Sequence, residues 1–333
     1  MSSLDYPHPD TPAPGATIEV APGMRWISMP LPFQLDHINL WLIGDTIIDT
    51  GIGDQATRAL WEKILPEKQI RRVILTHYHP DHAGNAAWLC ARFGAELWTT
   101  QGEYLTAHAV RSASAGYTTE AVLNVFRKNG LDAERSARMA GRGNRYAELV
   151  PEFPFSYRRI IEGDRVRIGA RDWRAFIGHG HAPEHLSLYC EALNVVIAGD
   201  MLLSTISTNV SVWSIDPEGD PLRLFLESIA RYRELPEDVL VLPSHGKPFR
   251  GAHARVAQLE AHHRDRLEEL SKELQQKPRS AADLLGVLFR RPLDTHQTFF
   301  AMGEAIAHLH YLYYAGRVKR AGGADGIMRY AAS

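Results

Sequence analysis

The stretch that most constrains this chain is Thr76–His82, which places four potential metal ligands within six positions: His77, His79, Asp81 and His82. It follows Arg72–Leu75, a short apolar run typical of a buried strand, and residues 83–85 begin an expected helix. Neutral imidazole nitrogens and carboxylate oxygens are the ligands that zinc and neighbouring transition metals prefer. The stretch therefore predicts a metal-binding turn, in preference to a His-rich surface turn in a chain with 16 histidines.

Composition sets broad limits on the class of protein. With 333 residues, 45% hydrophobic and 23% charged, the chain can form one large α/β domain plus a smaller module, or two domains. The net charge of −2 favours neither nucleic acid nor an anionic membrane as main partner. Cys90 and Cys190 are in no CxxC spacing, which is typical of reduced thiols. The polar N-terminus and the absence of an apolar run near ~18 residues predict a cytoplasmic protein without a membrane partner.

The expected order of segments is a leader, a catalytic domain and a C-terminal domain. Residues 1–16 contain four prolines and predict a flexible leader. Short apolar runs bounded by turn residues predict strands through 17–251, and the strand at 46–49, the helix after Asp54 and the strand at 72–76 make a β-α-β succession. A layered α/β architecture is the natural expectation for this domain.

Two helical regions accompany the predicted sheets. Residues 101–150 are expected to form a helical insertion, either a solvated surface element or a wall for the substrate. Residues 252–333 predict helices at about 252–276, 281–290 and 295–315, followed by two short strands around a glycine turn. Three helices and a β-ribbon are the outline of a winged-helix-like module.

Polar side chains suited to metal binding follow several predicted strands, where α/β architectures assemble their sites. In chain order these residues are Asp49, His77, His79, Asp81, His82, His181, Asp200 and His245. Eight candidates are too many for one tetrahedral zinc and about right for two metals that share a carboxylate.

The motif His77-x-His79-x-Asp81-His82, with His181, Asp200 and His245 after it, resembles the metal-binding pattern of the metallo-β-lactamase-fold hydrolases. The supporting segments are Asp49-Thr50-Gly51, residues 180–185 (GHAPEH, in place of the usual GHTPGH) and residues 242–246 (LPSHG). The resemblance covers about residues 17–250 and implies an αββα sandwich with a dinuclear centre at one edge of its sheets. Residues from about 252 resemble the winged-helix tail of the β-lactamase-like-protein-2 branch.

The resemblance implies a role for each residue of the pattern. His77, His79 and His181 would hold one metal; Asp81, His82 and His245 would hold the second; Asp200 would bridge them. Asp49 would orient a ligand from behind. The implied cofactors are two divalent ions, zinc first, with manganese or iron as alternatives. Asp81, Asp200 and His185 are the expected catalytic residues.

Some histidines and neighbours leave alternatives open. The spacing of the family motif selects His181 over His179 as ligand. His185 either contacts substrate or is a structural, hydrogen-bonding histidine. Tyr78 and Asn209 are candidates for lining the pocket. The pair His262-His263 lies on a charged predicted helix and is expected to be solvated.

The leading hypothesis is a dinuclear hydrolase that uses a metal-bridging hydroxide to cleave a small ester, thioester or lactone. The presence of Asp200 argues against a true β-lactamase. The histidine at position 79 argues against the flavodiiron branch, and residues 243–246 (PSHG) argue against glyoxalase II. No motifs of the RNA-cleaving β-CASP subgroup stand between Asp200 and His245. A metal-dependent single-strand endoribonuclease and a mononuclear iron persulfide dioxygenase are the alternatives.

The C-terminal module bears on the choice of partner. Residues 252–333 contain 12 Lys and Arg against 9 Asp and Glu, an excess of three positive charges. Since each neutralised phosphate needs its own cation, this bias is too small to predict a nucleic-acid surface. A small acyl substrate is the favoured partner, and the module is expected to shape the pocket or to form a homodimer contact.

Overall fold

The computed structural model describes residues 4–33, 35–65, 69–141 and 143–333. Its internal contacts divide the chain into two compact units, each built from three separate stretches. Unit 1 comprises Met1–Ser112, Arg145–Thr208 and Ser228–Val256, and unit 2 comprises Ala113–Asn144, Asn209–Glu227 and Ala257–Ser333.

Unit 1 contains two β-sheets. The first has seven strands in sequential order, antiparallel from β1 to β4 and parallel from β4 to β7. Its strands are β1 (Thr17–Ala21), β2 (Met24–Pro30), β3 (His37–Ile43), β4 (Thr46–Ile48), β5 (Arg72–Ile74), β6 (Glu96–Thr99) and β7 (Arg158–Arg159). The second has the order β12-β11-β10-β9-β8, and only its β11–β12 pair is parallel. Its strands are β8 (Arg165–Ile168), β9 (Arg171–Gly178), β10 (His185–Cys190), β11 (Val195–Gly199) and β12 (Leu240–Pro243).

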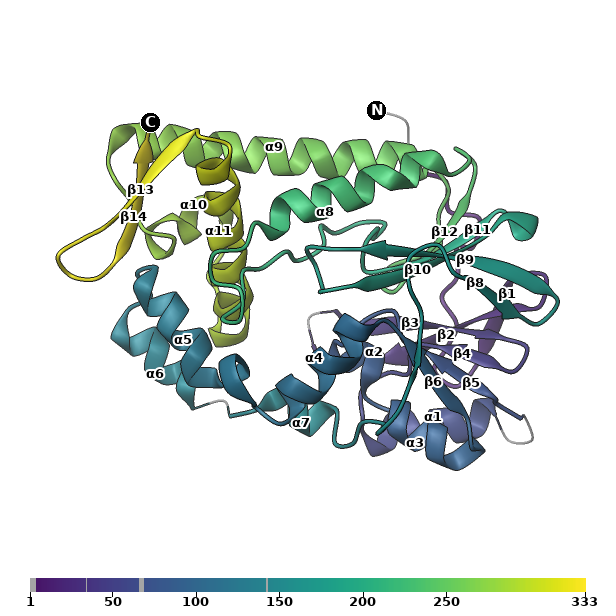
Figure 1. Ribbon diagram of the computed structural model, residues 1–333. Coiled ribbons are helices and arrows are strands. Elements are labelled where there is room, and N and C mark those ends of the chain that lie inside the picture. The colour runs from purple at the N-terminus through teal and green to yellow at the C-terminus, as the bar shows by residue number, and fades with distance from the viewer. Residues whose placement is uncertain (1–3, 34, 66–68, 142) are drawn as a thin grey trace. The chain divides into compact units, whose positions relative to one another are not determined.

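The two sheets stack face to face with helices outside them, an αββα sandwich as expected (Figure 1). The side chains of β3 show how a sheet packs on both of its faces, because alternate side chains point to opposite faces of a strand. Ile38, Leu40 and Leu42 join the core beneath the outer helices, whereas Trp41 and Ile43 join the core between the sheets. A strand covered on both faces is apolar almost throughout, and β3 has six buried residues in succession, 38–43.

Helices cover the outer face of the first sheet, and a 3₁₀ turn contacts the second. On the first sheet lie α1 (Gln55–Ile64) and α3 (Ala86–Phe93), and α1 begins at Asp54, whose side chain accepts the Thr57 N–H at 2.7 Å, the cap expected from the sequence. On the second sheet, the hydroxyl of Tyr232 in the 3₁₀ turn η3 (Arg231–Glu234) hydrogen-bonds Ser187 of β10 at 2.7 Å. The other elements of unit 1 are α2 (Pro80–Ala83), α4 (Gln101–Arg111), α7 (Arg145–Leu149) and η2 (Glu191–Leu193).

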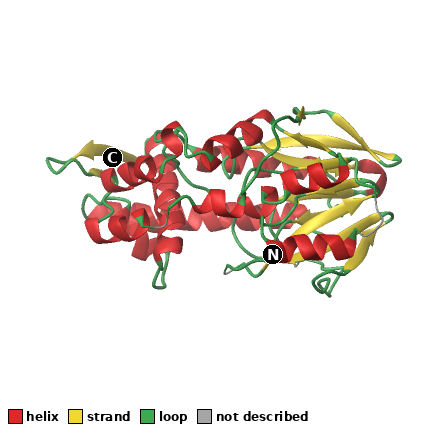
Figure 2. Ribbon diagram, turned by 90° about the horizontal axis from the view of Figure 1, so that it is seen from below, coloured by secondary structure: helices red, strands yellow, loops and turns green. Residues whose placement is uncertain are grey.

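Unit 2 is mostly helical and ends in the hairpin β13–β14 (Figure 2). Its elements are η1 (Ala115–Tyr117), α5 (Thr119–Lys128), α6 (Ala133–Ala140), η4 (Ala282–Leu284), α10 (Leu285–Leu288), α11 (Thr295–Tyr314), β13 (Val318–Gly322) and β14 (Met328–Ala332). Two further helices, α8 (Pro221–Ala230) and α9 (Ala252–Gln276), begin or end in unit 1. No helix within the described residues is both long and apolar enough to span a bilayer.

One local prediction for this unit holds in part, and another was wrong. The helix expected at 281–290 is present over 282–288 as η4 followed by the single turn α10, and the chain becomes extended at Phe289. His263 is not solvated but 1% exposed, and its Nδ1 lies 3.2 Å from Nε2 of His308 on α11. The charged residues next to His263 in the sequence lie on the opposite face of α9, so they do not describe the environment of the His263 side chain.

Candidate metal centre

The candidate ligands gather at one edge of the sandwich because the strands before them run in the same direction. Strands β9 and β11 are both antiparallel to β10, and β12 is parallel to β11, so the carboxyl ends of β9, β11 and β12 share one edge. The residues that follow these ends are His181, Asp200 and His245. Parallel β4 and β5 of the first sheet likewise lead into Asp49 and the Thr76–His82 turn.

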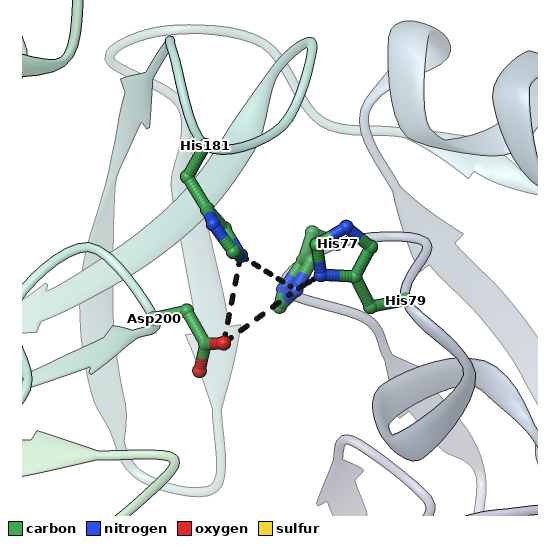
Figure 3. A group of neighbouring side chains, drawn as sticks. All are labelled: His77, His79, His181 and Asp200. Atoms are coloured by element: carbon green, nitrogen blue, oxygen red, sulfur yellow. Dashed lines mark hydrogen bonds and ion pairs between the residues drawn. The ribbon is translucent and has the colours of Figure 1, made fainter. Parts of the chain in front are cut away.

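The first ligand group consists of His77, His79, His181 and Asp200, whose side chains point toward one another (Figure 3). Nε2 of His77 lies 2.9 Å from Nδ1 of His79 and 3.2 Å from Nε2 of His181. Oδ2 of Asp200 lies 3.5 Å from Nε2 of His181 and 4.0 Å from Nε2 of His77.

The second group consists of Asp81, His82 and His245. Oδ2 of Asp81 lies 3.6 Å from Nε2 of His82 and 3.3 Å from Nε2 of His245. The other carboxylate oxygen of Asp200, Oδ1, lies 3.6 Å from Nε2 of His82 and 3.7 Å from Nε2 of His245. Asp200 therefore turns one oxygen to each group.

These spacings fit metal ions. Four ligand atoms at about 2.0–2.1 Å from a tetrahedral ion lie about 3.3 Å from one another, close to the separations in both groups. Nε2 of His82 and Oδ1 of Asp200 are buried and have no hydrogen-bond partner among the described residues. Since a buried polar atom without a partner is costly, a cation between the groups would satisfy both atoms.

Hydrogen bonds from outside the second group fix which nitrogen of His82 and of His245 faces inward. Nδ1 of His82 donates to Oδ2 of Asp49 at 2.8 Å, and Nδ1 of His245 donates to the His37 carbonyl at 2.9 Å. With Nδ1 protonated, Nε2 of each neutral ring carries the lone pair that a metal needs. Asp49 contacts His82 as expected, and that this contact orients a metal ligand stays a prediction.

The electrostatics of the site favour a positive charge between the carboxylates. Burial lowers the pKa of His77 well below its usual range and that of His79 to about 3, so both rings are neutral. Burial also lowers the pKa of His82, but three nearby carboxylates outweigh burial and raise that pKa to about 10: Asp49, Asp81 and Asp200. The negative potential that would hold a proton on His82 would equally attract a dication.

His185 lies behind the ligands. It is fully buried, and its Nε2 accepts the backbone N–H of Asp200 at 3.0 Å, which fits the structural alternative for this histidine. Gly199 makes this contact feasible: its φ is 54°, and a Cβ there would lie 2.4 Å from the His185 ring. A catalytic role for His185 stays a prediction.

The remaining candidates lie outside both ligand groups. His179 holds the loop together, since its Nδ1 hydrogen-bonds the Pro183 carbonyl at 2.7 Å and its N–H donates to Ser228. The Tyr78 ring is buried, with its centroid 4.7 Å from that of His79. Asn209 belongs to unit 2, where it donates to Glu304 at 3.1 Å.

Asn39 supports the site but carries no sequence signal. It is fully buried in β3, and its Nδ2 donates to the carbonyls of Pro243 and Gly246 at 2.8 and 2.6 Å. Its Oδ1 accepts the Trp26 indole N–H at 2.8 Å. One amide thereby ties the first sheet to the loop that carries His245, more than 200 positions away.

Comparisons with known proteins agree with this geometry. The family profile described as "Metallo-beta-lactamase superfamily" matches residues 35–245, and the one described as "Metallo-beta-lactamase-like, C-terminal domain" matches residues 267–333. The Bacillus subtilis (strain 168) protein named "Probable metallo-hydrolase YqjP" is 26% identical over 320 residues, which cover 86% of this chain and 91% of that protein.

Two solved structures are similar over nearly the whole chain. A β-lactamase domain protein from Burkholderia ambifaria has 48% sequence identity and a TM-score of 0.93, covering 99% of this chain and 98% of its own. A metallo-β-lactamase family protein from Thermus thermophilus has 30% identity and a TM-score of 0.79, covering 95% of this chain and 100% of its own.

Proposed function

Because the chain belongs to the metallo-β-lactamase superfamily, we propose that it is a metal-dependent hydrolase with a dinuclear centre that cleaves a small ester, thioester or lactone. The proposed ligands of one ion are His77, His79 and His181, those of the other are Asp81, His82 and His245, and Asp200 is shared. The imidazole-rich set favours zinc, with manganese and iron as alternatives.

The observation that carries this proposal is the orientation of Asp200. Its Oδ2 lies 3.5 Å from His181 in the first group, and its Oδ1 lies 3.6 Å from His82 in the second. Burial raises the pKa of Asp200, but the imidazoles of His245, His82 and His181 outweigh burial and keep that pKa well below its usual range. A carboxylate held ionised between two ligand groups supports a site for two ions.

The residues of the chain bind the metal ions, orient the ligand rings and keep water away from the buried side of the site. When bound, two divalent ions lower the pKa of water from ~15.7 toward ~7 and polarise a substrate carbonyl. Asp49 and the His37 carbonyl hold Nδ1–H of His82 and His245, and thereby keep both Nε2 atoms directed at the site. His185 fixes Asp200 through its backbone N–H, and its fully buried ring excludes water from behind the ligands.

An acyl substrate is favoured over a phosphodiester by the distribution of charge. The excess of three positive charges over residues 252–333 is small. Several exposed arginines of unit 2 also pair with acids on their own segment, as Arg127 does with Glu120 and Arg138 with Glu134. Paired cations contribute little to tracking a phosphate backbone, since each neutralised phosphate needs its own cation.

Hydrolysis of a panel of acyl substrates by metal-reconstituted protein tests the proposal. We expect cleavage of at least one ester, thioester or lactone, with about two zinc or manganese ions per chain by elemental analysis. Acyl hydrolysis no faster than in the metal-stripped control would contradict it. Salt-sensitive RNA cleavage without acyl hydrolysis would favour the endoribonuclease, and one iron per chain with oxygen uptake would favour the dioxygenase.

A further inference from the structure

Helix α4 contributes a buried carboxylate that joins two of the ligand loops. The Glu103 side chain is 1% exposed and accepts two backbone hydrogen bonds. Its Oε2 accepts the Tyr78 N–H at 2.8 Å, and its Oε1 accepts the Glu184 N–H at 2.6 Å. Burying a carboxylate costs free energy unless it is hydrogen-bonded. The two backbone N–H groups supply these hydrogen bonds to Glu103.

The two donor residues lie in the loops that carry the histidines of the first ligand group. Tyr78 stands between His77 and His79 in the loop after β5 of the first sheet. Glu184 stands in the loop after β9 of the second sheet, which carries His181. The two oxygens of one carboxylate therefore span the loops that supply all three histidines of the first ligand group.

The loop after β9 also contacts α4 through the side chain of Glu184. Oε2 of Glu184 accepts the Gly102 N–H in the first turn of α4 at 2.7 Å, and the Thr100 hydroxyl donates to the Glu184 carbonyl at 2.8 Å. Gly102 leaves room for this arrangement, because a Cβ there would lie 2.9 Å from Cγ of Glu184. Glu184, the departure from the usual glycine of the motif, thus has a partner of its own in α4.

The first loop is held from its other side as well. The hydroxyl of Tyr146, on α7, donates to the Tyr78 carbonyl at 2.6 Å. Both backbone polar groups of Tyr78 are therefore fixed, one by α4 and one by α7. The peptide units on either side of Tyr78 cannot rotate without breaking a buried hydrogen bond, which fixes the direction of His77 and His79.

We propose that Glu103 is a positioning residue that sets the spacing between His77, His79 and His181, and thereby the metal affinity of the first ligand group. The inference rests on the proposed function, since it requires that these histidines bind metal. Partners behind the ligands of metal sites typically change metal affinity by about 10–100-fold when they are removed.

The test compares Glu103→Gln with wild-type protein. A glutamine offers one carbonyl oxygen and places an NH₂ group where the second N–H must be accepted, so one loop loses its anchor. We expect zinc affinity, measured by competition with a chromophoric chelator, to fall about 10–100-fold at one of the two sites. In the metal-free protein, amide hydrogen exchange at Tyr78 or Glu184 should become faster. A second variant, Glu184→Ala, removes only the contact of the Glu184 side chain with α4 and should weaken the same site by a smaller factor.

Glu162→Gln is the matched control. Glu162 also accepts a backbone N–H, from Ile177 at 2.7 Å, but it spans no ligand loops, so this variant should keep the zinc affinity of the wild type. If wild-type protein binds neither zinc nor manganese nor iron, the proposed function fails. If it binds zinc and Glu103→Gln binds equally tightly with unchanged exchange, the role of Glu103 is overturned. Should Glu103→Gln not fold, wild-type zinc affinity in Glu103→Asp, whose side chain is one methylene shorter and cannot span both N–H groups, would overturn it.

Discussion

Asp49 accepts a hydrogen bond from Nδ1 of His82 at 2.8 Å, across 33 positions of the sequence. The same carboxylate accepts the N–H and the hydroxyl of Thr76, each at 2.8 Å, so it ties the end of β4 to both ends of the ligand turn. Asp49 holds this position with φ at 59°, a left-handed conformation that costs a non-glycine residue about 1–3 kcal/mol. The packing around a 1% exposed side chain offsets that strain.

Asp49→Asn should weaken metal binding by the second ligand group. Asparagine keeps the shape of the side chain but has one acceptor oxygen, whereas Thr76 and His82 together present three donors. We expect the affinity for the second metal to fall about 10–100-fold, measured by calorimetric titration of the metal-free protein. Two sites with wild-type affinities would show that Asp49 does not orient His82 for binding.

Asp200→Ala should reduce hydrolysis to the level of the metal-stripped protein, because both groups lose their shared carboxylate. His179→Ala serves as the comparison and should retain most of the activity, since His179 hydrogen-bonds Pro183 and lies outside both groups. Metal content by elemental analysis accompanies the rate measurements. Equal metal loss in the two variants would overturn the choice of His181 over His179.

Gly84→Ala should destabilise the protein and impair the site. A Cβ at Gly84 would lie 2.3 Å from the Gly53 nitrogen and 2.6 Å from the carbonyl oxygens of Gly51 and Leu149, so backbone would have to move. Overpacking of this kind costs about 1–3 kcal/mol or more, and the shift would reach His82 two positions earlier.

Gly286→Ala provides the control for this substitution. A Cβ at this position of α10 has nothing within 4 Å, and alanine is favoured over glycine in a helix by up to about 1 kcal/mol. Urea denaturation of the two variants should separate them clearly. Similar unfolding midpoints would contradict the close backbone approach at Gly84.

Glu304→Gln should alter the pH dependence of stability. Burial raises the pKa of Glu304 to about 7, even though Asn209 and Arg266 act to lower it. A carboxyl whose pKa is higher in the folded than in the unfolded state binds its proton more tightly when folded. Its contribution to the free energy of unfolding is therefore present at low pH and is lost as pH rises from about 4.5 to about 7.

The measurement is denaturant unfolding of metal-free wild-type and variant proteins at pH 5 and pH 8. The wild type should lose about 1–3 kcal/mol more than Glu304→Gln between these values. The difference between the two proteins isolates Glu304 from other titrating groups. Parallel pH profiles would show that Glu304 keeps an ordinary pKa in the folded protein.

Local sequence patterns predicted most of the fold. A short apolar run located β3, and the cap at Asp54 located the start of α1, because both signals lie within a few neighbouring residues. The helix predicted at 281–290 is shorter in the structure, where η4 and α10 together span 282–288; Gly286 lies within this stretch, and glycine is a weak helix former. Domain boundaries and ligand roles stay predictions.

The sequence by itself determined the chemistry available at the site: imidazoles and carboxylates placed just after strands, in the order of a known family. Only the tertiary structure decided how they are held. Glu103 and Asn39 carry no motif, and their partners lie 25 and 204 positions away. The tertiary structure also buried His263 and turned His185 toward the Asp200 backbone. A motif records which atoms can bind a metal, whereas their direction depends on hydrogen bonds between segments that only folding brings together.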